Sequence, residues 1–159
     1  MNVRAITAAP IRKSLRVRAP REGAFRTFVA SMGSWWPKEH SVLTAPRADV
    51  VIEPEVGGRW YEIGEDGSEY QWGRVLLWDA PERIVLAWQL TADFTYDPEF
   101  ETEVEVRFLA DGQETLVEFE HRHLERYGAE GAARLAELEM GMDAGWGDIL
   151  ERYRIAAVS

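Results

Sequence analysis

The feature that most constrains the fold is a pair of alternating segments separated by a turn. Apolar or small residues occupy alternate positions of 102–108 and 114–121, namely Val104, Val106, Phe108, Thr115, Val117 and Phe119. Such alternation is typical of half-buried β-strands, because successive side chains in a strand point to opposite faces. Asp111-Gly112 lies between the segments, and this dipeptide favours a tight hairpin turn. The chain therefore contains antiparallel strands with one apolar face.

Five further strands and two helices complete the predicted order. The strands are expected at 11–18, 49–54, 58–63, 69–78 and 83–91. For 58–63 and 69–78 both faces carry large residues, and neither alternation frame is preferred. A helix from Pro20 to about Met32 opens with proline, which suits a first helical turn. Apolar residues recur every three or four positions over 129–156, which predicts one amphipathic helix of about seven turns. The order is β-α-β6-α, in a single α+β domain spanning 1–159 with a flexible N-terminus at 1–9.

The charge is unevenly distributed along the chain. The formal net charge is −10, yet residues 1–26 contain seven basic residues and a single acidic one. An acidic protein is repelled by phosphates, so nucleic acid is not expected as a partner. The basic segment could dock an anionic partner. The alternative is that arginines at 12, 16 and 18 face the acidic side of a neighbouring strand, and this alternative is favoured.

Several classes of protein are excluded or disfavoured. The chain has no cysteine, so disulfides, thiolate metal sites and cysteine nucleophiles are absent. The first ten residues lack a signal-peptide core, and the longest apolar run, 84–88, is far too short to span a bilayer. No dinucleotide-binding, P-loop, zinc-protease or nucleophile-elbow motif occurs. We expect a cytoplasmic protein that needs no cofactor and does not insert into membranes.

Few residues in the sequence suggest a catalytic, ligand-orienting or metal-binding role. His121 is in phase with the apolar positions of its strand, so its ring should point inward. It could be a core histidine bonded to its neighbours, or a group that orients a ligand or moves a proton. His121 and His123 with Glu125 could begin a metal site, but no third convincing ligand follows, and no metal is expected. Glu139 and Asp143 could form a carboxylate pair, although a solvated helix face is the simpler interpretation.

Seven tryptophans and three glycines raise the question of a pocket. The tryptophans could simply fill the core, or their flat rings could border a cavity. Gly141, Gly145 and Gly147 lie within the predicted C-terminal helix, where each costs about 1 kcal/mol relative to alanine. Their presence suggests that either the sheet or a ligand approaches the helix backbone there.

Read together, several segments resemble one known family, the single-domain bacterial branch of the family named for the activator of heat-shock protein 90 ATPase. The segments are Trp35-Trp36-Pro37, 53–62 (EPEVGGRWYE), Asp66-Gly67, 72–75 (WGRV), 78–84 (WDAPERI), Trp88, Thr115, Glu120-His121, Gly145-Trp146 and Leu150. This branch lies within the START-like (SRPBCC) helix-grip superfamily. The resemblance covers about residues 10–155. It implies a curved seven-stranded antiparallel sheet wrapped around a long C-terminal helix, with an apolar cavity between them.

The resemblance also implies a range of functions, since superfamily members bind hydrophobic molecules and some are cyclases or hydrolases. The leading hypothesis is a binding protein for a small hydrophobic molecule, lipid-like or aromatic. Its expected contacts are Trp36, Trp60, Trp72, Trp88, Val106, Phe119, His121, Met142 and Trp146. An enzyme is the alternative, with His121 as its one candidate catalytic residue and Glu62 as a possible partner.

A third hypothesis is an interaction module associated with a chaperone and the stress response. The family's name comes from a eukaryotic co-chaperone with an additional N-terminal domain, which this sequence lacks, so a chaperone partner is the weaker expectation. An exposed face of 69–78 could support a homodimer.

Overall fold

The strands form one antiparallel sheet in which the chain returns to its starting edge. The computed structural model describes residues 9–136 and 141–158, with backbone alone for 136 and 141–144. The strands are β1 (Ile11–Val17), β2 (Arg47–Ile52), β3 (Arg59–Gly64), β4 (Glu69–Asp79), β5 (Arg83–Trp88), β6 (Thr102–Asp111) and β7 (Glu114–Arg122). Their spatial order is β1-β7-β6-β5-β4-β3-β2. All strands of the predicted order are present, and only Ala9 of the predicted flexible N-terminus lies within the described residues.

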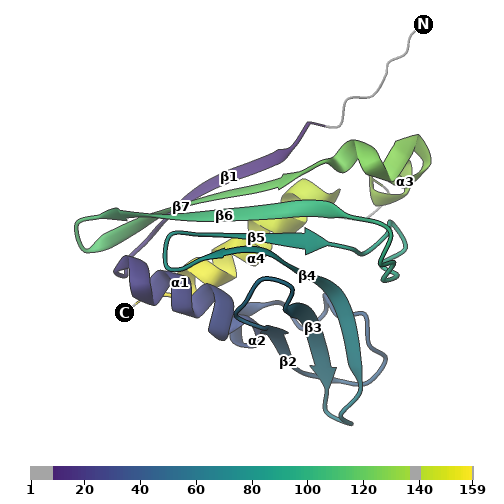
Figure 1. Ribbon diagram of the computed structural model, residues 1–159, viewed down its shortest axis with the longest axis horizontal. Helices are drawn as coiled ribbons and strands as arrows, with labels where there is room; N and C mark the ends of the chain where they lie inside the picture. Colours follow the sequence, from purple (N-terminus) through teal and green to yellow (C-terminus); the bar gives the residue numbers. More distant parts are fainter. Residues whose placement is uncertain (1–8, 137–140, 159) are drawn as a thin grey trace, which may run out of the picture.

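The two longest described helices lie on one face of this curled sheet (Figure 1). The helices are α1 (Arg21–Ala30), α2 (Met32–Trp35), α3 (Gly128–Ala136) and α4 (Gly141–Ala156), with a 3₁₀ turn η1 (Leu124–Tyr127) after β7. Phe28 of α1 packs against Phe108 of β6 and Tyr153 of α4, so both helices cover the apolar, concave face. This is the helix-grip arrangement that the resemblance implies. Among the described helices, none has the length and apolarity needed to cross a membrane.

The inward faces of β6 and β7 are those that the alternation predicts. Val104, Val106, Phe108, Val117 and Phe119 are all at most 2% exposed. The hairpin joins Asp111 to Glu114 through two central residues, the first of which, Gly112, has a φ of 64°. Glycine adopts this left-handed conformation without the steric penalty that a side chain would add.

The basic N-terminal segment is explained by the strand beside it. β1 pairs with β7, which places Arg12 opposite Glu120, with 3.5 Å between the guanidinium Nε and the carboxylate. Arg16 lies 2.6 Å from Asp111 and 3.5 Å from Glu114. The interpretation of the basic strand face as a partner of acidic residues is confirmed for Arg12 and Arg16.

The C-terminal helix is shorter than predicted. In place of one helix over 129–156, the structure has α3 of 9 residues and α4 of 16 residues, about 24 Å long. α3 follows η1 beyond the end of β7, whereas α4 crosses the concave face of the sheet (Figure 1). The apolar spacing continues through both helices, and this local period carries no information on a change of direction. Residues 137–140, between the two, lie outside the described residues.

The structure also settles which side chains of β3 and β4 face the core. Trp60, Glu62 and Trp72 are at most 2% exposed and point to the concave side. Tyr61 lies on the other face under the guanidinium of Arg59, 4.1 Å from its ring centroid. Register shifts occur in both strand pairs that involve β4, and such bulges break simple alternation. These bulges explain why no single frame is preferred in the sequence.

Candidate functional site

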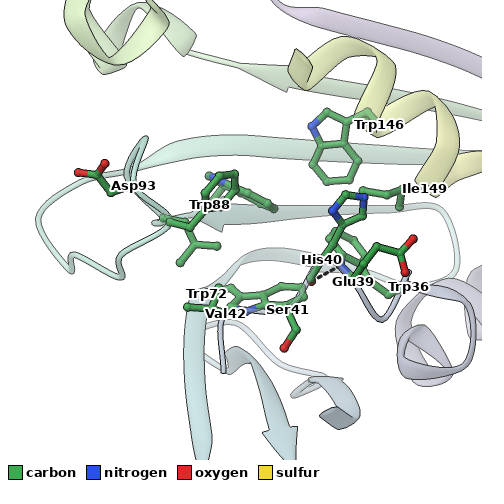
Figure 2. Close-up of a pocket in the computed structure, with 13 residues that line it drawn as sticks. Trp36, Glu39, His40, Ser41, Val42, Trp72, Trp88, Asp93, Trp146 and Ile149 are labelled. Carbon is green, nitrogen blue, oxygen red and sulfur yellow. Dashed lines mark hydrogen bonds between the residues drawn. The ribbon is translucent and has the colours of Figure 1, made fainter. Parts of the chain in front are cut away.

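A cavity of about 390 Å³ opens between α4, the sheet and two loops. Its walls come from the loop after α2 (36–42), from β4 and β5, from the loop after β5 (90–94) and from α4. The lining residues are Trp36, Glu39, His40, Ser41, Val42, Trp72, Trp88, Leu90, Asp93, Phe94, Gly145, Trp146 and Ile149. Figure 2 shows Trp146 on one side of the open space, Trp72 and Val42 on the opposite side, and Trp88 between them. Segments distant in sequence thus share one apolar cavity.

Four indole rings that line this cavity form a closed circuit, in which each ring contacts the next and the last contacts the first. Consecutive ring centroids are 5.0 Å apart for Trp36 and Trp72, 6.4 Å for Trp72 and Trp88, 5.5 Å for Trp88 and Trp146, and 5.6 Å for Trp146 and Trp36. The rings are tilted or perpendicular to one another, so the circuit offers both ring faces and ring edges. Aromatic rings attract one another in these geometries.

Three of these indoles are held in place through their N–H groups. Trp72 donates to the Glu62 carboxylate at 2.7 Å, Trp146 donates to His121 Nδ1 at 3.1 Å, and Trp36 donates to the carbonyl oxygen of His40 at 3.1 Å. An indole N–H can only donate, so each bond fixes the position of its ring. Three of the four rings are therefore anchored by hydrogen bonds within the protein.

Glu62 is a fully buried carboxylate that accepts four hydrogen bonds. Oε2 accepts from the Val42 amide at 2.9 Å and from the Trp72 indole; Oε1 accepts from the Leu43 amide at 3.2 Å and from the Ser41 hydroxyl. Four acceptor positions are all that an ionised carboxylate has. Glu62 does not contact His121 in this arrangement, so the predicted acid–base pair does not form.

Glu62 contacts the end of the loop 36–43, and the side chain of Arg47 contacts its start. The Arg47 guanidinium donates to the carbonyl oxygens of Trp36 at 2.6 Å and Pro37 at 3.0 Å, and its side chain is buried. Burial lowers the pKa of Arg47, and the negative charge of Glu62 opposes this shift. The two charges therefore act on each other across the loop that they hold.

His121 points inward as predicted, but it is sealed from the cavity. Because Trp146 can only donate, Nδ1 of His121 is the accepting nitrogen, and Nε2 carries the proton that bonds Thr102 Oγ1 at 2.8 Å. Thr102 in turn donates to the carbonyl oxygen of Trp88 at 3.1 Å. Burial lowers the pKa of His121 to about 3. A neutral ring with both nitrogens engaged is a poor proton shuttle, so the structure argues against His121 as a catalytic residue.

The remaining predicted site residues fall into three groups. Trp36, Trp72, Trp88 and Trp146 line the cavity. Trp60, Val106, Phe119 and His121 are buried behind this lining. The side chain of Met142 lies outside the described residues, as do Glu139 and the Asp143 side chain of the suggested carboxylate pair.

The suggested pair of imidazoles does not converge. β7 ends at Arg122, and His123 has a left-handed φ of 65°, so the strand alternation that would put its ring on the same face as His121 does not extend to it. Its nitrogens lie 3.7 Å from Glu103 and 3.8 Å from Glu125. Within the described part of the chain, no three histidine or acidic side chains are placed to hold a metal ion.

Sequence reasoning missed the two loops that border the cavity. Glu39, His40, Ser41 and Val42 have no periodic pattern, and Phe94 has a φ of 59°, which is rare for a bulky residue. The only sequence signal was the Trp-Trp-Pro triplet at the start of the first loop. Loop residues of this kind are recognised as site residues only when the fold brings them to a cavity.

Gly145 of α4 adjoins open space rather than the sheet. A Cβ atom on Gly145, which lines the cavity, would have no neighbour within 4 Å, and one on Gly147 would have only Lys13 Nζ, at 4.0 Å. Of the two explanations for these glycines, close approach of the sheet is therefore wrong for Gly145, and at Gly147 only the end of one β1 side chain comes as near as 4.0 Å. The surroundings of a side chain at Gly141 lie outside the described residues. An approaching ligand at Gly145 is compatible with the structure.

Acidic groups at the mouth are each paired with an arginine from a C-terminal helix. Arg152 of α4 lies 3.7 Å from Glu39, and Arg134 of α3 lies 2.7 Å from Asp93. No lysine or arginine lines the described cavity. The site thus combines apolar walls with acidic side chains whose charges are balanced by arginines at the mouth.

Comparison with known proteins agrees with this architecture. The family model for activator of Hsp90 ATPase homolog 1-like proteins matches residues 18–156. No curated protein sequence matches the chain.

Two solved structures share 34% of their sequence with the chain. One is described as an anthrahydroquino-γ-pyrone synthase, Txn09, complexed with SUM; the match covers 92% of this chain and 95% of that one, with a TM-score of 0.64. The other is the self-sacrificing resistance protein CalC from Micromonospora echinospora, with 93% of each chain covered and a TM-score of 0.68. The Aha1 dimer from Colwellia psychrerythraea, at 14% identity, 94% and 96% coverage and a TM-score of 0.63, shares the fold.

Proposed function

This chain belongs to the family of activator of Hsp90 ATPase homolog 1-like proteins, and we propose that it binds a small hydrophobic molecule, aromatic or lipid-like, in the cavity between the sheet and α4. The observation that carries the proposal is the indole-walled cavity of about 390 Å³. Binding sites for small molecules span roughly 300–1,000 Å³ and have mostly apolar walls with a few polar groups. The size and lining of this cavity are within that class.

The driving force is the burial of apolar ligand surface, about 25 cal/mol for each Å² removed from water. The tilted rings of Trp36, Trp72, Trp88 and Trp146 favour a flat aromatic ligand, which can stack on one ring and meet the edge of another. His40 and Ser41 at the mouth supply polar atoms that can orient it. The absence of a lysine or arginine from the described lining disfavours an anionic ligand.

One of the two relatives at 34% identity supports a small-molecule role. It is a synthase named for an anthrahydroquino-γ-pyrone, a fused-ring aromatic, and its structure is described as a complex. The other is a resistance protein. The first of them supports an aromatic small molecule as the ligand of a chain of this kind.

Filling the cavity at Gly145 tests the proposal. Gly145→Leu extends a side chain into the open space beside the indoles, and we expect the affinity for a fused-ring ligand to fall by at least about tenfold while the fold is retained. Affinity is measured by the change in tryptophan fluorescence on titration with N-phenyl-1-naphthylamine, a neutral aromatic probe.

Two variants control for effects on the helix itself. Gly145→Ala raises helix propensity in the same way but adds little volume, and Gly147→Leu adds the same side chain on a position that does not line the cavity. Both should retain the binding of the parent protein. Equal affinity in Gly145→Leu and Gly147→Leu would contradict binding at this cavity.

A further inference from the structure

Two buried charged side chains, Glu62 and Arg47, hold the loop 36–43. This inference rests on the proposed function, because it concerns the same cavity. Five of the thirteen lining residues belong to this loop, and it carries the amides and carbonyl groups that Glu62 and Arg47 contact. Neither Glu62 nor Arg47 lines the cavity itself.

We propose that Glu62 and Arg47 are positioning residues of the binding cavity, which fix the loop 36–43 and the Trp72 ring as one preformed wall. Arg47 holds the start of the loop through the carbonyl groups of Trp36 and Pro37. Glu62 holds its end through Ser41, Val42 and Leu43. The guanidinium can only donate and the ionised carboxylate can only accept, so each charge matches the backbone groups that it meets.

The same carboxylate joins the loop to the sheet. Oε2 of Glu62 accepts from both the Val42 amide and the Trp72 indole, so one oxygen atom links two cavity walls. Both Val42 and Trp72 line the cavity. Residues 38–40 of this loop are exposed, and without the buried contacts the loop would sample several conformations. Ordering it on binding would weaken the affinity. Holding it in advance removes that cost.

The isosteric variant Glu62→Gln removes one of the two oxygen atoms that accept these hydrogen bonds. The amide has one oxygen, and its NH₂ group must replace either Oε1 or Oε2. If it replaces Oε2, both Val42 and Trp72 lose their acceptor; if it replaces Oε1, the Ser41 hydroxyl can turn to accept, but Leu43 cannot. In either case at least one backbone N–H of the loop is left without a partner.

The experiment compares Glu62→Gln with Glu105→Gln. Glu105 is also a buried carboxylate of the same sheet, but it lies on the outer face, where it pairs with Arg83, Arg107 and Arg122. We expect Glu62→Gln to weaken the binding of N-phenyl-1-naphthylamine by about tenfold, which corresponds to 1.4 kcal/mol. It should also speed hydrogen exchange at the Val42 or Leu43 amide. Glu105→Gln should change neither property.

The outcomes separate the two proposals. Parent-like affinity and parent-like exchange at 42 and 43 in folded Glu62→Gln would overturn the positioning role, as would equal losses in Glu105→Gln. The parent protein could bind no aromatic probe while Glu62→Gln still speeds hydrogen exchange at residues 42 and 43. In that case the proposed binding function is wrong, and the role of Glu62 in positioning the loop stands. Should Glu62→Gln not fold, Arg47→Lys replaces the two-pronged contact by a single ammonium; weaker probe binding then supports the proposal, and unchanged binding contradicts it.

Discussion

Two buried titratable side chains, Glu62 and His121, each hold an indole that lines the cavity. Glu62 accepts from Trp72 and His121 accepts from Trp146. Buried polar groups are tolerated when their hydrogen bonds are satisfied, and here the partners are themselves residues of the cavity wall. The stability of the core and the shape of the cavity therefore depend on the same atoms.

His121 makes the stability of the protein depend on pH in a defined direction. Its pKa is lowered from 6.5 in the unfolded chain to about 3 in the folded protein, so the unfolded state binds the proton more readily. This contribution to stability is complete above about pH 6.5 and is lost as the pH falls toward 3, by up to about 1.4 kcal/mol for each pH unit.

His121→Gln removes this titration while an amide can still accept from Trp146 and donate to Thr102. We expect the free energy of unfolding in urea to fall less steeply between about pH 6.5 and pH 5 in the variant than in the parent. Identical slopes in the two proteins would show that His121 is not the neutral, sealed ring described above.

Among the elements, the sheet shows how local and long-range signals combine. β6 and β7 alternate cleanly because their pairing has no register shift and one face is buried, whereas β3 and β4 contain bulges and face buried groups on both sides. At the edge, β1 is paired to β7 by complementary charges. Exposed ion pairs contribute little free energy each, so these charges favour the register of β1 more than its stability.

Two glycines, one in a helix and one in a hairpin, should respond oppositely to alanine. Gly23 lies inside α1 and Gly112 in the β6–β7 turn, and an added Cβ would have no neighbour within 4 Å at either position. Gly23→Ala should stabilise the protein by up to about 1 kcal/mol, because alanine is the better helix former. Gly112→Ala should destabilise it by about 1 kcal/mol, because its φ of 64° is unfavourable for a side chain. Chemical denaturation measures both, and changes of the same sign would contradict this assignment of backbone conformations.

At the scale of the whole molecule, six tryptophans pack together where the sheet, the loop after α2 and α4 meet. Trp35, Trp36, Trp60, Trp72, Trp88 and Trp146 are linked by ring contacts of 5.0–6.4 Å between centroids. They come from α2, the following loop, β3, β4, β5 and α4. No one of these elements can bury its rings without the others.

This shared cluster predicts cooperative unfolding. Tryptophan fluorescence, which reports the cluster, and far-ultraviolet circular dichroism, which reports the backbone, should give the same midpoint and the same free energy of unfolding. A fluorescence transition that precedes the loss of secondary structure would indicate that the cluster separates while the sheet remains, contrary to this expectation.

The sequence was most informative where the physical signal is local. The inward direction of His121 follows from its place in an alternating strand, and the pairing of the basic first strand follows from its charge pattern. The bonds that Trp146 and Thr102 make to His121 do not follow, because they join residues 25 and 19 positions away. Likewise, the apolar period of 129–156 identified helical structure but not its division into α3 and α4.

By itself, the sequence determined an antiparallel meander with one apolar face, a partnered basic strand and helical segments at both ends, because side-chain periodicity, turn residues and charge act between near neighbours. Only the tertiary structure decided that a cavity exists and which residues line it. The walls converge from the loop after α2, from β4, β5 and the loop after β5, and from α4, so the empty volume depends on how these elements meet. Packing over such separations leaves no periodic trace in any one segment, which is why His40 and Val42 at the mouth and Glu62 behind it could be assigned their places only in the folded chain.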